Sequence, residues 1–414
     1  MTAAVGGDML ATAPVRAQTA EPVSARVAAV EADPANAPAL WVDVRGPLVE
    51  YGATPEAPVT VTFLWRGTTQ KEVELSWPVW TPDRGENLLK HIPDTDVWYK
   101  TVALPPKTRL SYQLAVDPVR GKSGDREAYR RGLRAALAPD PLNANRAGDM
   151  SVLELAGAPS QSYVARRIGV DAGRLTRETV TLNGRTYEIS FYRPAGIAAE
   201  VQTPLVVLFD AERYLEDIPT PVILDNMIAD RVIPPVSAVL IRNATDTSRG
   251  TDLACNDTFA DALAGQLMPR VRQTMAVSDK PADIVLAGSS FGGLMAACTA
   301  LRHPETFGAV LSQSGSYWWN PESEPSTAIE THYIIRWVRD HPRVPVRFYI
   351  DAGVLEQRVG DETGSIFLTS QALSKALQDK GYVATFQPVA GGHDDVVWRG
   401  TLSDGLIELL GGRP

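Results

Sequence analysis

IVLAGSSFGGLMAACTA, residues 284–300, is the stretch from which the fold of this chain is best predicted. Four apolar residues form a short strand pattern, Gly288–Gly292 fits G-x-S-x-G, and small residues at helical spacing follow. A nucleophile elbow places a serine on a tight turn between strand and helix, with glycine where a side chain would strike backbone. This setting predicts Ser290 as a nucleophile and the Phe291 N–H as one oxyanion donor. The alternative is a plain Gly/Ser-rich loop.

A serine hydroxyl needs a base, and His393 is the predicted one. In this fold the histidine follows the nucleophile and the acid near the C-terminus, and GGHDD (391–395) comes after the strand pattern 383–389. The other four histidines are assigned to the N-terminal domain, a helix end or the surface: His91, His303, His332 and His341.

The acid is predicted in the loop that follows the strand pattern 346–350. Glu356 is preferred because it lies far enough into the loop to reach an imidazole, and Asp351 stays the alternative. A dyad without an acid also stays open. Asp394 is expected to point away from the ring of His393. A second oxyanion donor is predicted in the loop 210–214, at a backbone N–H near Ala211.

The chain divides into three predicted segments. Residues 159–414 alternate strands with helices, which predicts an α/β-hydrolase domain: a mostly parallel sheet with helices on both faces. Residues 38–158 contain short β-type runs, starting with Leu40–Val44, which predict a small β-sandwich domain followed by a connector. Residues 1–37 are predicted to be a disordered tail or a remnant export signal, with 23–37 as a flexible lead-in.

Composition limits the classes of function and partner. The 414 residues carry a formal net charge of −9, which argues against nucleic acid as a partner. The sequence has no apolar run of about 18 residues, so no membrane span is predicted. Cys255 and Cys298 do not have the sequence spacing of metal ligands, and they are predicted to be structural thiols rather than part of a disulfide framework. No metal site is expected. The oligomeric state is left open.

The compartment has two candidates. APVRAQTAEP (13–22) is similar to the tail of a secretory signal, but a basic region and an apolar region are missing before it. We therefore expect a cytoplasmic protein, with a periplasmic one as the alternative if an upstream export signal has been lost.

Several motifs resemble the enterochelin esterases, which hydrolyse ferric catecholate siderophores. The resemblance covers roughly residues 40–411 and both domains. Its motifs are GSSFGGL (288–294), SQSGSYWW (312–319), GGHD (391–394) with VWRG (397–400), the Arg249-x-x-Asp252-Leu253-x-x-Asn256 segment, and DPLN (140–143) leading to SVLEL (151–155). Ala211 and Tyr214 depart from the family pattern near the oxyanion loop.

The resemblance implies a serine esterase that cleaves the trilactone of a ferric siderophore such as enterobactin, with Ser290, His393 and Glu356 as its catalytic residues. No cofactor is implied, since iron belongs to the substrate. A trianionic ferric tris-catecholate favours guanidinium groups and aromatic surfaces. The candidate contacts are Arg249, Trp318, Trp319 and Trp398, with ordinary core packing as the alternative for the tryptophans. Arg399 is assigned to a structural ion pair.

Two other functions stay open. The same groups could act on another ester, such as a feruloyl or acetyl carbohydrate ester. A non-catalytic binder could keep the elbow as structure alone.

Overall fold

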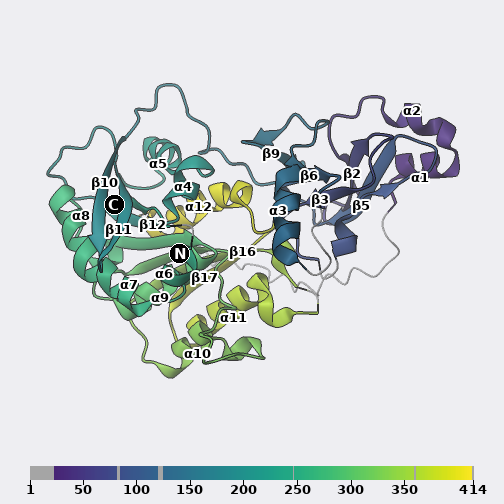
Figure 1. The fold of residues 1–414 in the computed structure, drawn as a ribbon. Coiled ribbons are helices and arrows are strands. Elements are labelled where there is room, and N and C mark those ends of the chain that lie inside the picture. Colours follow the sequence, from purple (N-terminus) through teal and green to yellow (C-terminus); the bar gives the residue numbers. More distant parts are fainter. Residues whose placement is uncertain (1–22, 82–83, 120–124, 246, 359, 413–414) are drawn as a thin grey trace.

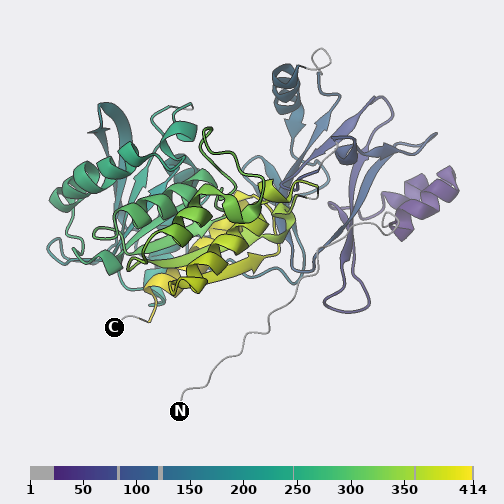
Figure 2. The same ribbon diagram turned by 90° about the horizontal axis from the view of Figure 1, so that it is seen from below.

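The computed structural model describes residues 23–81, 84–119, 125–245, 247–358 and 360–412. A β-sandwich and a larger α/β domain lie side by side, as Figures 1 and 2 show. The chain passes once from the first to the second, after β9. The order of elements therefore follows the two-part organisation of the sequence.

The sandwich consists of two antiparallel sheets. The first has the strand order β1 (Leu48–Glu50), β2 (Val59–Arg66), β5 (Val97–Leu104), β4 (Lys90–His91). The second runs β3 (Val73–Ser76), β6 (Arg109–Val116), β9 (Met150–Glu154), β8 (Arg146–Ala147), with β7 (Leu137–Ala138) also paired to β6. Phe63 and Tyr112 meet edge to face between the sheets, where their burial stabilises the packing. The turn η2 (Arg84–Asn87) and helix α3 (Arg126–Ala136) complete this domain.

The prediction of a flexible lead-in is wrong for residues 23–37. They form α1 (Ala25–Ala32), η1 (Pro34–Asn36) and the start of α2 (Ala37–Leu40), so Leu40–Val44 is not a strand either. Val27 and Val30 lie three residues apart on one helix face and are buried in a cluster with Leu64. The segment is rich in alanine, so this apolar helix face was not recognised from the sequence. Residues 1–22 lie outside the described residues.

The second domain is built on an eight-stranded sheet. Its strand order is β10 (Arg174–Leu182), β11 (Arg185–Arg193), β13 (Ser237–Ile241), β12 (Leu205–Phe209), β14 (Ile284–Ser289), β15 (Ala309–Gln313), β16 (Arg347–Gly353), β17 (Val383–Val389). The strands from β13 to β17 are mutually parallel, and β10 and β11 form an antiparallel hairpin at one edge. Asn183 and Gly184 both have positive φ, which is the turn geometry that matches strand twist in a two-residue hairpin.

Helices cover both faces of this sheet, as expected for an α/β-hydrolase. One face packs against α7 (Asp257–Ala262), η3 (Leu263–Leu267), α8 (Met268–Thr274), α9 (Phe291–Arg302), α10 (Tyr333–Asp340) and α11 (Ile366–Asp379). The other packs against α4 (Ala211–Glu216), α5 (Thr220–Ala229) and α12 (Asp395–Leu410). Short helical turns are α6 (Arg249–Asp252), η4 (Pro281–Asp283), η5 (Ile329–Thr331), η6 (Val354–Glu356) and η7 (Glu362–Gly364). Within the described ranges, no helix combines the length and apolar character needed to cross a bilayer.

Cys255 and Cys298 form a disulfide, with their Cα atoms 5.4 Å apart, which corrects the prediction of two thiols. Cys298 lies on α9, and Cys255 lies in the turn between α6 and α7. Because α7 packs on α9, the fold brings together two positions that are 43 residues apart. Sequence spacing carries no sign of that packing.

We predict that replacing both Cys255 and Cys298 by serine lowers the free energy of unfolding by about 4 kcal/mol, because the link restricts the unfolded chain. Urea unfolding with and without a reductant measures this difference. The reductant should shift the midpoint of the wild-type protein and leave the double variant unchanged. Equal wild-type midpoints in both conditions would contradict the prediction.

Candidate active site

Ser290 occupies a strained turn between β14 and α9. Its backbone has φ 59° and ψ −122°, a region that residues other than glycine rarely adopt and that persists only where the surroundings fix it. A Cβ on Gly288 would lie 2.6 Å from the backbone carbon of Gly292, so the strand and helix can approach only with glycine at 288. The Ser290 N–H donates to the carbonyl of Gln313 at 2.9 Å, which holds the turn on β15.

Glu356 and His393 are joined by a hydrogen bond. Glu356 ends η6, and its Oε1 lies 2.6 Å from His393 Nδ1. Its Oε2 accepts the Ser314 hydroxyl at 2.6 Å and the Gly353 N–H at 2.7 Å. The Glu356 side chain is 2% exposed and that of His393 is 35% exposed, so the acid is enclosed while the imidazole is partly open to solvent. A carboxylate in this position fixes the ring orientation and the tautomer.

Asp351 is not bonded to His393. It lies at the end of β16 and is fully buried, and this burial raises the pKa of its carboxyl group well above the usual range. Burial therefore disfavours the charged form of this group. A buried carboxyl group with no bond to His393 is poorly placed to stabilise an imidazolium.

The Ser290 hydroxyl is not hydrogen-bonded to His393 in the described structure. Its Oγ lies 3.3 Å from Ser316 Oγ, and His393 Nε2 has no hydrogen-bond partner among the described residues. Bonds between a catalytic serine and its base commonly tighten only in the substrate complex. The imidazole Nε2 is thus available for a proton.

Two helix N-termini supply backbone N–H groups close to the serine. Phe291 opens α9 and Ala211 opens α4, so neither N–H has an acceptor within its own helix. The turn before Ala211 is fixed by Asp210, which has φ 56° and binds Arg249 through two contacts of 2.7 Å. A Cβ on Gly292 would lie 3.3 Å from Asp210 Oδ2, so the start of α4 lies against the elbow.

Arg249, Phe291 and Trp318 come together beside the elbow. The Arg249 guanidinium carbon lies 5.9 Å from the centroid of the Phe291 ring, and the Phe291 and Trp318 rings meet edge to face at 5.9 Å. Trp319 packs instead against Tyr333 at the edge of the core. Of the predicted substrate contacts, Arg249 and Trp318 therefore lie against Phe291, the residue that follows Ser290.

Trp398 is fully buried, so the prediction that it contacts substrate is wrong. Its indole N–H donates to Ser314 Oγ at 3.0 Å, and its ring meets His393 edge to face at 4.7 Å. Trp398 therefore supports the Glu356–His393 pair through Ser314. Arg399 hydrogen-bonds the side chain of Gln161 at 2.7 Å.

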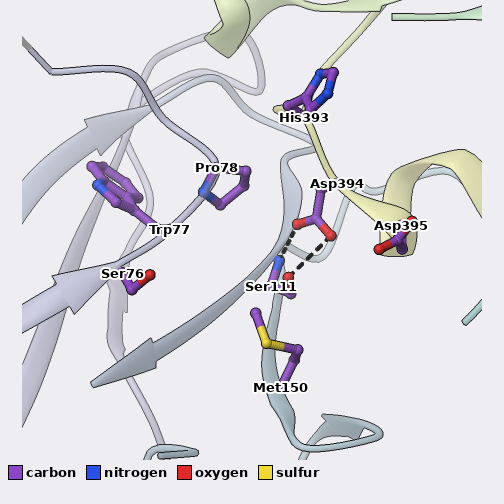
Figure 3. A pocket seen from close by; sticks show the side chains of 8 residues that line it. All are labelled: Ser76, Trp77, Pro78, Ser111, Met150, His393, Asp394 and Asp395. Atoms are coloured by element: carbon purple, nitrogen blue, oxygen red, sulfur yellow. Dashed lines mark hydrogen bonds between the residues drawn. The ribbon is translucent and has the colours of Figure 1, made fainter. Parts of the chain in front are cut away.

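A cavity of about 220 Å³ lies between the sandwich and residues 390–395, the histidine loop. Figure 3 shows its lining, in which the Asp394 side chain points away from the His393 ring, as expected, and toward Ser111. The eight lining residues come from β3 and the segment after it, from β6 and β9, and from the histidine loop: Ser76, Trp77, Pro78, Ser111, Met150, His393, Asp394 and Asp395. The N-terminal domain thus forms one wall beside His393.

Three serines of this region were not predicted from the sequence as site residues: Ser314, Ser316 and Ser111. Ser314 and Ser316 belong to the serine-rich run 312–316, which was a usable signal. Ser111 lies in the other domain, 283 residues from its partner Asp394, and no sequence signal pointed to it. Among the described residues no group of His, Cys, Asp and Glu side chains is arranged to hold a metal ion.

Two family models match the chain. One is described as "Putative esterase" and matches residues 180–409, and the other, "Enterochelin esterase, N-terminal", matches residues 60–164. Iron(III) salmochelin esterase of Escherichia coli O6:H1 is 31% identical over 91% of this chain and 94% of its own length. Iron(III) enterobactin esterase of the same strain is 30% identical over 89% and 95%.

Two solved structures that match this chain are enterobactin esterases as well. The ferric enterobactin esterase of Salmonella typhimurium has a TM-score of 0.73 at 27% identity and covers 90% of this chain and 98% of its own. The enterobactin esterase of Shigella flexneri, crystallised in the presence of enterobactin, has a TM-score of 0.69 at 28% identity and covers 90% and 97%. Both domains of the present chain are therefore shared with these proteins.

We predict that Glu356→Gln lowers kcat by about 10³- to 10⁴-fold, because an amide cannot stabilise the imidazolium or hold its tautomer. Asp351→Asn is the matched control and should keep kcat within a few-fold, since the carboxyl group bonded to His393 is that of Glu356 and not that of Asp351. Steady-state hydrolysis of an aryl ester measures both. A larger loss in the Asp351 variant would reverse the assignment.

Proposed function

This chain belongs to the enterochelin esterase family, and from that membership we propose that it hydrolyses the trilactone esters of a ferric catecholate siderophore, with Ser290 as nucleophile. The observation that carries the catalytic assignment is the 2.6 Å hydrogen bond between Glu356 and His393, which follow the ends of β16 and β17 as Ser290 follows the end of the parallel strand β14. An imidazole held by a buried carboxylate is suited to accept a proton from a neighbouring hydroxyl.

In the acylation step, Ser290 Oγ attacks the ester carbonyl carbon while His393 Nε2 takes the hydroxyl proton. The N–H groups of Phe291 and Ala211 stabilise the resulting oxyanion. When the tetrahedral intermediate collapses, His393 returns the proton to the departing alkoxide, and the acyl group stays on Ser290. Water then repeats the sequence, releasing the acid and restoring the serine.

Support for a siderophore substrate comes from the relatives and from the charge near the elbow. The relatives that match both domains are enterobactin and salmochelin esterases. Arg249 is 27% exposed and lies over Phe291, although Asp210 balances much of its charge. A trianionic complex would share this guanidinium with Asp210 and stack on Trp318.

We predict that Ser290→Ala lowers kcat on ferric enterobactin by about 10³- to 10⁶-fold without loss of folding, because the nucleophile is absent. Chromatography of the products measures trilactone opening, and circular dichroism checks the fold. A fluorophosphonate probe should label the wild-type protein and not the variant.

The substrate class is tested separately by competition between ferric enterobactin and a feruloyl sugar. Preference for the ferric trilactone in kcat/KM supports the siderophore. Preference for the sugar ester, with Ser290 still essential, would reject the siderophore and keep the catalytic mechanism.

The sequence predicts the cytoplasm and leaves the periplasm as the alternative, and we propose the alternative. The Cys255–Cys298 disulfide supports an oxidising compartment, since cytosolic thiols are normally kept reduced. We predict that alkylation of free thiols in intact native cells, before lysis, leaves both cysteines unmodified in the mature protein. Mass spectrometry reads this out, and alkylation of both residues would place the protein in a reducing compartment.

A further inference from the structure

The Asp394 carboxylate connects the histidine loop to the sandwich domain. Its Oδ2 accepts the backbone N–H of Ser111 on β6 at 2.5 Å, and its Oδ1 accepts the Ser111 hydroxyl at 3.0 Å (Figure 3). The same Oδ1 accepts the N–H of Val396 at 3.1 Å, which caps α12. Asp394 directly follows His393. Its side chain therefore joins the histidine loop to strand β6 and to the start of α12.

Asp394 is 5% exposed, and a buried carboxyl group is stable there only with hydrogen-bond partners. Burial raises its pKa, and the hydrogen bonds from Ser111 and Val396 lower it. Because the Ser111 bonds come from the other domain, they depend on the contact between the domains. This carboxyl group would be left with unfilled acceptor positions if the sandwich moved away.

The residues before His393 are held by the sandwich as well. The Ala390 carbonyl accepts the N–H of Arg109 on β6 at 3.1 Å. A Cβ on Gly392 would overlap the carbonyl oxygen of Pro78, so sandwich backbone lies directly against this glycine. Gly391 is held from the other side, where its carbonyl accepts the N–H of Leu355 at 3.0 Å.

These contacts matter because two glycines precede His393. A Gly-Gly segment has many accessible conformations, so its own sequence does not fix the imidazole. Catalytic groups must be held close to the productive geometry, and a displacement of about 1 Å costs roughly 10²-fold in rate. The restriction must come from neighbours, and β6 supplies contacts on both sides of His393.

We infer that the N-terminal sandwich positions the catalytic histidine, with Ser111 as a positioning residue that acts through Asp394 on His393. This inference rests on the proposed role of His393 as the base. The sandwich is then part of the hydrolytic machinery, in addition to forming a wall of the cavity. Ser111 itself touches neither Ser290 nor the ester.

The test compares kcat and KM for 4-nitrophenyl butyrate in the full-length protein and its variants. Ser111→Ala removes one of the two bonds from Ser111, and we expect kcat to fall about 10-fold with KM unchanged within twofold. Asp394→Asn changes the carboxyl oxygens that face Ser111, and we expect a fall of about 10²-fold. Thr101→Ala is the matched control, because it also removes a hydroxyl hydrogen bond within the sandwich, the 2.9 Å bond between Thr101 Oγ1 and Thr62 Oγ1, at a position that does not line the cavity; its kcat should be unchanged.

A double-mutant cycle separates positioning from a general structural effect. With His393→Ala as the background, adding Ser111→Ala should leave the residual kcat unchanged, because the residue through which Ser111 acts is gone. An equal fold-loss in both backgrounds would overturn the inference, as would a wild-type kcat for both Ser111→Ala and Asp394→Asn. If His393→Ala alone kept full activity, the catalytic assignment itself would fail, so the two failures are distinguishable.

Discussion

The arrangement of the site depends on one backbone constraint, the positive φ of Ser290. A positive φ at a serine is unfavourable, so neighbouring groups must compensate for it. The Ser290 N–H donates to the Gln313 carbonyl, and the Ser290 carbonyl accepts the N–H groups of Leu294 and Ser316. Three bonds to β15, to the segment after it and to α9 thus fix the residue. The hydroxyl is presented at the carboxyl edge of the sheet because the strained turn cannot relax.

The end of β15 extends this constraint to the rest of the site through buried hydrogen bonds. The Gln313 side chain accepts the Tyr214 hydroxyl at 2.7 Å and donates to the Trp398 carbonyl at 2.8 Å. Ser314 Oγ accepts a hydrogen bond from the indole N–H of Trp398, and the Ser314 hydroxyl donates one to Glu356 Oε2. Buried polar groups that are all satisfied in this way rigidify a unique arrangement. One strand end therefore connects α4, the last helix and the acid that is bonded to His393.

Local rules made the elbow and the order of its partners predictable from the sequence. G-x-S-x-G after an apolar strand identified Ser290, and chain order selected His393, because both depend on neighbouring residues and strand succession. Glu356 was preferred over Asp351 from loop position, whereas both acids are buried in the structure and only Glu356 is hydrogen-bonded to His393, a contact that only packing reveals. The same limit explains Trp398, whose burial follows from α12 lying against the sheet, and the Cys255–Cys298 pair, which depends on α7 meeting α9.

The histidine loop shows why two domains are required to define one side chain. Asp394 and Asp395 are adjacent, yet they bind in different directions: Asp394 to Ser111 of the sandwich, and Asp395 to Arg213 on α4. Arg213 also lies over the buried Trp398 ring, at 4.9 Å, so this second contact is itself anchored in the core. A loop attached at one point can still rotate about that point. Attachment at two consecutive residues, to two separate bodies, removes that rotation and leaves His393 one orientation, toward Glu356.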